Sequence, residues 1–317
     1  MARWLTIAVV VAGLLWGGWW VVGRQGVLRG AEAAIESARA QGWTIGYDDL
    51  SVTGFPNRFD TTLDAVSVAT PEGWGLTAPF LQVFALSYRP NHIIAVAPHE
   101  MAVATPAGTA EIRSDDLRAS AVVALADRAL DRATVTAEAL AVDARGWTLA
   151  VSSGQIALRR AGSPTTFDLA AGLSNIDPGG PLWQQLGRSV LPGRIDSFDL
   201  DAGLVLDDPL SPGNRPRPVS ADLRRLGIAW EGVRLDLSGP LTFDRTGRPS
   251  GALRLRARGW DELLDMAAAM GLIPAQQLPL LAAGLGGMAD GEGVLEVPVT
   301  LENGVLGIAG FPIGPVF

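Results

Sequence analysis

The sequence predicts a mainly β protein with a few helices, in which an N-terminal transmembrane helix precedes a long curved antiparallel sheet. Three observations carry this prediction. One uncharged segment is long enough to cross a membrane, and many later segments alternate apolar and polar residues. In addition, 38 glycines and 21 prolines in 317 residues supply the frequent turns that short strands need. The sheet could comprise two similar β-rich halves.

The composition narrows the classes of function. Charged residues make up 18% of the chain, and all 25 basic residues are arginines, against 33 acidic residues and a net charge of −8. An acidic chain is a poor binder of nucleic acid, because phosphate contacts dominate that affinity. We therefore expect no nucleic-acid partner. The absence of cysteine excludes disulfides, thiolate metal sites and a cysteine nucleophile.

The N-terminal segment is predicted to be a membrane anchor. Residues 4–23 carry no charge and lie between Arg3 and Arg24. As a helix they would span about 30 Å, the thickness of the hydrocarbon core of a bilayer. We assign residues 1–24 as an uncleaved transmembrane signal anchor; the alternative, a cleaved signal peptide, is disfavoured by the bulky residues that end the segment. The apolar face of residues 25–41 predicts a juxtamembrane helix that continues from the anchor.

The remaining chain changes to a period of two, which is typical of antiparallel strands with one apolar and one wet face. We divide it into an N-terminal β-rich part (42–206), a Pro-rich loop (207–218) and a C-terminal β-rich part (219–317) with a helical insert at 260–285. The segment 115–140 fits either a helix or strands. The clearest alternating segments are 50–53, 63–68, 81–88, 195–200, 233–237, 253–258 and 294–301.

No catalytic, cofactor or metal site is predicted. The spacing of His92 and His99 matches no metal motif, no Gly-x-Ser-x-Gly motif is present, and the Gly-rich segment 284–287 follows a predicted helix, not a strand. Asp199 and Asp201 would share one strand face, as alternating aspartates do on the wet face of a sheet. We therefore expect a protein without enzymatic activity or cofactor.

An amphipathic sheet with few covering helices must remove its apolar face from water, either by folding over on itself or by holding lipid. We expect this face to form a groove, with membrane lipids as its ligand. The predicted groove-lining residues are Val66, Val68, Phe84, Leu86, Leu235, Leu253 and Leu255.

Gly54, Phe55, Pro56, Arg58 and Phe59 are predicted to form a structural motif, a turn between two adjacent antiparallel strands. Pro56 cannot donate a ladder hydrogen bond, so it marks the interruption of strand pairing. We expect Phe55 and Phe59 to be buried, and Arg58 to be satisfied by a carboxylate or by carbonyl groups.

Residues 50–60 and 84–92, together with the anchor and residues 290–299, resemble the domain-of-unknown-function family 2125, which comprises uncharacterised envelope proteins of proteobacteria. The resemblance implies a single-pass inner-membrane protein with its C-terminal body in the periplasm. The arginines that flank the anchor do not determine this orientation by themselves. The family has no established activity and supplies no catalytic residues. More distantly, the anchor and the amphipathic strands are similar to AsmA-like envelope proteins, which are linked to outer-membrane assembly and lipid traffic.

Together these patterns predict a non-enzymatic, membrane-anchored periplasmic protein of the cell envelope. We expect it to handle lipids or to support outer-membrane biogenesis through an apolar groove. One alternative is a periplasmic scaffold that binds other envelope proteins. A second alternative is a hydrolase with an unrecognised site. The sequence leaves protein partners and the oligomeric state open.

Overall fold

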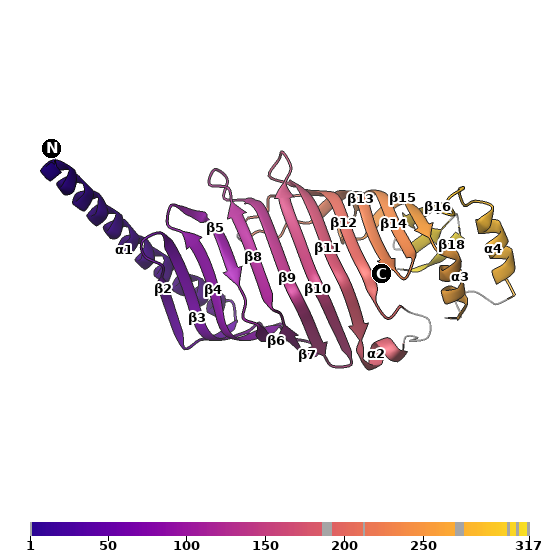
Figure 1. Ribbon diagram of the computed structural model, residues 1–317, viewed down its shortest axis with the longest axis horizontal. Helices are drawn as coiled ribbons and strands as arrows, with labels where there is room; N and C mark the ends of the chain where they lie inside the picture. The colour runs from indigo at the N-terminus through magenta and orange to yellow at the C-terminus, as the bar shows by residue number, and fades with distance from the viewer. Residues whose placement is uncertain are drawn as a thin grey trace. The chain divides into compact units, whose positions relative to one another are not determined.

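The computed structural model describes residues 2–185, 192–211, 213–269, 276–302, 305–308 and 311–315. It confirms a mainly β fold with few helices, in which a long apolar helix is followed by antiparallel strands (Figure 1). The chain forms two compact units. Unit 1 comprises residues 1–123 and 139–145, and unit 2 comprises residues 124–138 and 146–317.

Unit 1 contains the N-terminal helix and the strands that follow it. The predicted anchor and juxtamembrane helix form one continuous helix in the structure. The elements of unit 1 are α1 (Ala2–Ala40), β1 (Thr44–Gly46), β2 (Asp49–Thr53), β3 (Arg58–Ala69), β4 (Gly75–Leu86), β5 (Arg89–Val96), β6 (Glu100–Thr105), β7 (Gly108–Arg113), β8 (Asp116–Val123) and the end of β9 (Leu130–Ala144).

Strand β3 organises unit 1. One side of β3 pairs with β1 and β2 in turn, and its other side pairs with β4. Strand β4 then divides its second side, because residues 82–86 pair with β5 and residues 75–77 pair with β6. From there β5 pairs with β8, and β6 pairs with β7. All of these pairings are antiparallel, as the alternating sequence predicts.

Strands β1 and β2 pair with successive parts of β3 and so form one row beside it. Helix α1 lies against this row. Arg24 donates from Nε to the carbonyl oxygen of Val52 at 2.9 Å, and Arg39 donates from Nη2 to the carbonyl oxygen of Ile45 at 2.7 Å. An exposed row of backbone groups at the edge of a sheet invites pairing with other chains. The helix therefore covers this row and satisfies part of its hydrogen-bonding capacity.

Unit 2 is an antiparallel meander in which each strand from β10 to β18 pairs with the next (Figure 1). Its elements are β10 (Trp147–Arg160), β11 (Thr166–Gly179), α2 (Gly180–Gln185), β12 (Ile195–Leu206), β13 (Pro218–Trp230), β14 (Val233–Phe243), β15 (Pro249–Arg258), α3 (Trp260–Ala269), α4 (Leu278–Gly286), β16 (Leu295–Glu302), β17 (Val305–Ile308) and β18 (Phe311–Pro315).

The predicted segments can be compared with the observed strands and helices. The ambiguous segment 115–140 forms strand β8 and most of β9, so its β-branched residues outweigh its alanine content. Residues 207–217 connect β12 to β13 within unit 2. The division into two β-rich parts at that loop stays a prediction. Helix α3 falls within the predicted insert at 260–285, and α4 ends one residue beyond it.

The wet face of unit 2 carries arginine–carboxylate pairs between neighbouring strands. Arg224 contacts Asp201 at 2.6 Å and Asp168 at 3.0 Å, and Arg225 contacts Asp236 at 2.8 Å. These side chains are partly exposed, so solvent screens each pair and its contribution to stability is small. The pairs identify the face of the meander that meets water. The opposite, apolar face must be shielded from water by other parts of the protein or by a ligand.

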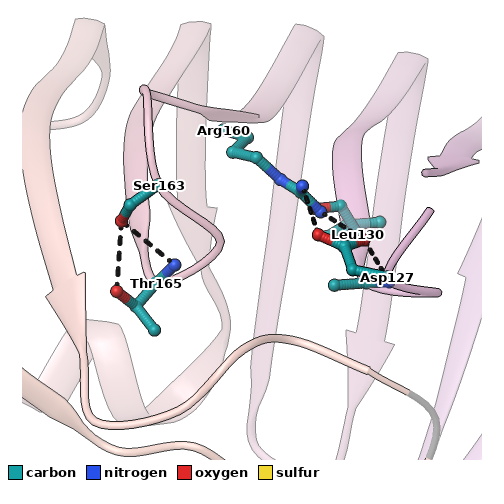
Figure 2. Close-up of polar contacts among 6 residues, drawn as sticks. Asp127, Leu130, Arg160, Ser163 and Thr165 are labelled. Carbon is teal, nitrogen blue, oxygen red and sulfur yellow. Dashed lines mark hydrogen bonds and ion pairs between the residues drawn. The ribbon is translucent and has the colours of Figure 1, made fainter.

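One better-shielded contact fixes the connection between β8 and β9. Figure 2 shows Arg160, at the end of β10, reaching this connection. Its guanidinium donates from Nη1 to Asp127 Oδ2 at 2.8 Å and from Nη2 to the carbonyl oxygen of Leu130 at 2.9 Å. Only 15% of the Arg160 side chain is exposed. In the neighbouring turn, the Ser163 hydroxyl accepts the backbone N–H of Thr165.

Hydrogen bonds lower several carboxyl pKa values in unit 2. The Arg160 guanidinium holds the pKa of Asp127 below its ordinary value of 3.8, and the Arg194 guanidinium does the same for Asp177. Hydrogen bonds also lower the pKa values of Asp168, Asp207, Asp244 and Asp290. A carboxyl whose pKa is lower in the folded state favours folding above its unfolded pKa, and this contribution is lost as the pH falls.

We therefore predict that unit 2 loses stability on acidification. The loss should begin as the pH falls towards 3.8, the ordinary carboxyl value, and continue below it. Thermal unfolding at graded pH measures this slope. Asp127→Asn should make the slope shallower, because it removes one of the shifted carboxyls. A melting temperature that is unchanged across this pH window would contradict the prediction.

Candidate apolar groove beside the N-terminal helix

One face of α1 packs against the turn between β2 and β3. Trp16 donates from Nε1 to the carbonyl oxygen of Pro56 at 3.1 Å, and Trp20 donates from Nε1 to the carbonyl oxygen of Arg58 at 2.8 Å. Residues 16, 20 and 24 share one helix face because they are four positions apart. The helix face that carries both indoles therefore meets the predicted motif residues directly.

Aromatic packing completes this contact. The ring of Trp20 stacks on Phe59 with centroids 6.2 Å apart, and it meets Phe55 edge-on at 5.4 Å. Phe59 is buried, with 5% exposed. A Cβ atom on Gly23 would lie 2.5 Å from the Phe59 ring, so only glycine allows the ring to approach the helix this closely.

The turn has the predicted position, and one of its predicted details is wrong. Strands β2 and β3 pair on either side of it, and Arg58 forms an ion pair with Asp60 at 2.7 Å. The expectation that Phe55 is buried is wrong, because 62% of Phe55 is exposed. The reason is that α1 occupies one side of the turn, so the Phe55 ring meets Trp20 with an edge and leaves its remaining surface outside.

The same end of unit 1 carries an apolar groove of about 510 Å³. Phe84, Leu86, Ile94 and Val96 supply its apolar walls from the neighbouring strands β4 and β5. In an antiparallel pair, directly opposite residues point to the same face, and Phe84 lies opposite Ile94. The groove therefore follows from the alternation of the two strands. Its volume lies within the usual range of ligand sites.

Polar side chains line the same groove. These are Gln82, Arg58, His92 and Arg118. The Arg58 guanidinium carbon lies 5.8 Å from the centroid of the Phe84 ring, and Arg118 pairs with Asp116 at 2.6 Å. More than half of each arginine side chain remains exposed, so both keep donors available to a ligand. The groove thus combines apolar walls with two cationic groups.

Arg58 links the groove to α1. Its backbone carbonyl accepts the Trp20 indole, and its side chain lines the groove. Its ion-pair partner Asp60 lies opposite Phe84 in the β3–β4 register. Within the described residues, Asp60 Oδ1 is buried without a hydrogen-bond partner, so Arg58 is the group that balances this carboxylate.

The predicted groove-lining residues separate into distinct environments. Phe84 and Leu86 line the groove of unit 1, whereas Val66 is buried in β3 with 2% exposed and Val68 is half-buried. In unit 2, Leu253 is buried with 7% exposed. The remaining two, Leu235 and Leu255, pack against a buried cluster of Ala257, Leu295 and Val297.

That packing in unit 2 forms a closed cluster. Ala257, Leu295 and Val297 are buried, and Trp260, Leu263 and Leu285 of α3 and α4 are among the side chains that pack against them. The two helices therefore cover this face at the Ala257 end of β15, whereas Leu253 and Val297 line a hollow of about 410 Å³ further along it. Alternation along a strand predicts which residues share a face, but it does not show whether that face is open or covered.

The other candidate chemical groups are separated or already paired. His92 lines the groove, whereas His99 Nδ1 lies 2.9 Å from the carbonyl oxygen of Ser114. Asp201 pairs with Arg224, as expected of a wet sheet face. Within the described ranges, no group of three or more His, Cys, Asp or Glu side chains is placed to hold a metal ion. Residues 284–286 end helix α4.

The fold and this groove define a mainly β protein whose N-terminal helix is long and apolar enough to cross a membrane. Little of the most apolar window of that helix, 6%, is buried, so α1 is not a core helix. The chain belongs to the family of uncharacterised proteins conserved in bacteria called DUF2125, whose model matches residues 20–316. It matches no curated protein and no solved structure.

The contact between α1 and the turn predicts a difference between two glycines. Gly23→Ala should destabilise the protein, because the added Cβ would lie 2.5 Å from the Phe59 ring. At Gly26, a Cβ would meet nothing within 4 Å, so Gly26→Ala should be neutral or stabilising by up to about 1 kcal/mol. Thermal unfolding of the two variants in detergent measures both effects. Equal melting temperatures would show that α1 does not pack on Phe59.

Proposed function

We propose that this protein is anchored in the inner membrane by α1, places its body in the periplasm, and binds lipid in the groove of unit 1. The observation that carries the proposal is the position of Arg58, which contacts α1 through its backbone and the groove through its side chain. A ligand in this groove would lie beside the helix that reaches the membrane. The periplasmic side rests on the resemblance to envelope proteins.

The chemistry of the groove suits an anionic lipid. Burial of an acyl chain against Phe84, Leu86 and Ile94 would contribute roughly 0.8 kcal/mol for each methylene removed from water. The guanidinium groups of Arg58 and Arg118 would meet a phosphate, which arginine binds through paired N–H donors. An apolar ligand without a charged group would contact only the apolar walls, and the N–H donors of Arg58 and Arg118 would remain hydrated.

A scaffold role is the second candidate, and unit 2 favours it. There side chains of α3 and α4 pack over Ala257 and Leu295, at one end of the apolar face of β15 and β16. The edges and loops beside this covered end are available for contact with other envelope proteins. The two functions predict different consequences for a charge placed in the groove of unit 1.

We predict that Ile94→Glu abolishes the binding of phospholipid, because the added carboxylate would place a charge against the acyl chain and would compete with the lipid phosphate for the donors of Arg58 and Arg118. Ile93→Glu is the matched control. The two neighbours are similarly exposed, at 37% and 39%, but only Ile94 lines the groove and successive strand residues point to opposite faces. Native mass spectrometry of the detergent-purified full chain, incubated with phosphatidylglycerol, counts the bound lipid.

Equal lipid binding by the two variants and the unaltered chain would overturn the groove proposal and favour the scaffold role.

The compartment is tested separately with Glu72→Cys, an exposed turn position in a chain that otherwise has no cysteine. In intact cells with a permeabilised outer membrane, a maleimide that cannot cross the inner membrane should label this residue. Labelling only after the inner membrane is broken would place the body in the cytoplasm.

A further inference from the structure

The end of unit 1 that contacts α1 contains two adjacent turns, which we call the tip. The tip comprises Phe55, Pro56 and Asn57, between β2 and β3, and Ser87 and Tyr88, between β4 and β5. The backbone N–H of Ser87 donates to the carbonyl oxygen of Asn57 at 2.9 Å, so the two turns are joined.

The length of α1 places the tip at the depth of the membrane. Trp16, which donates to the Pro56 carbonyl, precedes Gly23 by seven residues, or about 10 Å along a helix. If the tip lay wholly in water, only residues 4–15 of the uncharged segment that follows Arg3 would remain to cross the membrane. That segment reaches about 18 Å, short of a hydrocarbon core of about 30 Å, and tilting shortens its reach further.

Part of the backbone of the tip is hydrogen-bonded within the protein. Two of its carbonyl groups accept such bonds: that of Pro56 from the Trp16 indole, and that of Asn57 from the Ser87 N–H. The flanking carbonyls of Gly54 and Arg58 accept from the Arg58 N–H and the Trp20 indole. Proline has no N–H to satisfy. An unsatisfied backbone group in a membrane costs several kcal/mol, so these bonds lower the cost of insertion.

The side chains of the tip have the composition of a membrane interface. Phe55 is 62% exposed and Tyr88 is 60% exposed, and on α1 Trp16 and Trp19 are 40% and 56% exposed. Tyrosine and tryptophan are enriched at the level of the lipid headgroups. Asn57 and the Arg58 side chain are also exposed, so the depth of the tip is the outer part of the acyl-chain region, from which these polar groups extend to the headgroups.

We propose that the tip inserts into the outer acyl chains of the lipid bilayer, beside α1, so that unit 1 contacts the membrane through its sheet as well as through its helix. This inference rests on the proposed anchor. It adds a second membrane contact, made by Phe55 and Tyr88, whose partner is the bilayer itself. It also places the groove lined by Arg58 at the level of the headgroups.

The experiment uses four single-cysteine variants of the full chain, which has no cysteine of its own. Phe55→Cys and Tyr88→Cys place a nitroxide label at the tip, and Val10→Cys places one in the middle of the uncharged segment. Glu72→Cys is the matched control, because it is an exposed turn beyond the other end of β3. Each protein is reconstituted in vesicles of phosphatidylethanolamine and phosphatidylglycerol. Electron paramagnetic resonance then measures collisions with oxygen, which favours lipid, and with a water-soluble nickel chelate.

We expect the labels at positions 55, 88 and 10 to collide severalfold more with oxygen than with the chelate, relative to the label at position 72. Tip labels that are as accessible to the chelate as position 72, with position 10 protected, would overturn the insertion of the tip and leave the anchor intact. A position 10 that is also accessible to the chelate would overturn the anchor and this inference with it.

Discussion

The packing of α1 against the row of β1 and β2 is the constraint on which unit 1 depends. Val52 and Ile45 in this row accept hydrogen bonds from Arg24 and Arg39 of the helix. An uncovered row would be a site for pairing with other chains. The close approach at Gly23, where the ring of Phe59 fills the space of a Cβ atom, sets the register between the helix and the sheet. The apolar helix is thus part of the fold of unit 1 as well as a segment able to cross a membrane.

This packing determines where the chemical features of unit 1 lie. The turn that contacts Trp16 and Trp20 begins β3, and the first residue of β3 is Arg58, which also lines the apolar groove. A single short segment therefore sets the helix position, the exposed aromatic tip and one cationic group of the groove. In unit 2 the corresponding apolar face is covered by α3 and α4 at one end, over Ala257 and Leu295. The proposed lipid site consequently belongs to the unit that carries the helix.

The sequence predicts the local features of this protein well and its long-range features less well. Alternation with a period of two identifies strands such as β4 and β15, and the uncharged segment identifies α1. Phe55 is predicted wrongly because an aromatic residue in a turn is normally buried, and the sequence does not show that α1 occupies the inner side of that turn. Likewise, Phe84 and Leu255 have equivalent patterns, yet Phe84 lines an open groove and Leu255 packs against a buried cluster that α3 and α4 also contact, because covering depends on elements distant in the chain.

A double-mutant cycle between Trp20 and Phe59 tests most directly whether α1 is part of the fold of unit 1. The free energy of unfolding is measured for the unaltered chain, Trp20→Ala, Phe59→Ala and the double variant in one detergent. Stacked aromatic pairs couple by about 0.5–1.5 kcal/mol, so the double variant should lose less stability than the sum of the two single variants. Strictly additive losses would show that the two rings do not interact, and would contradict the packing of the helix on the sheet.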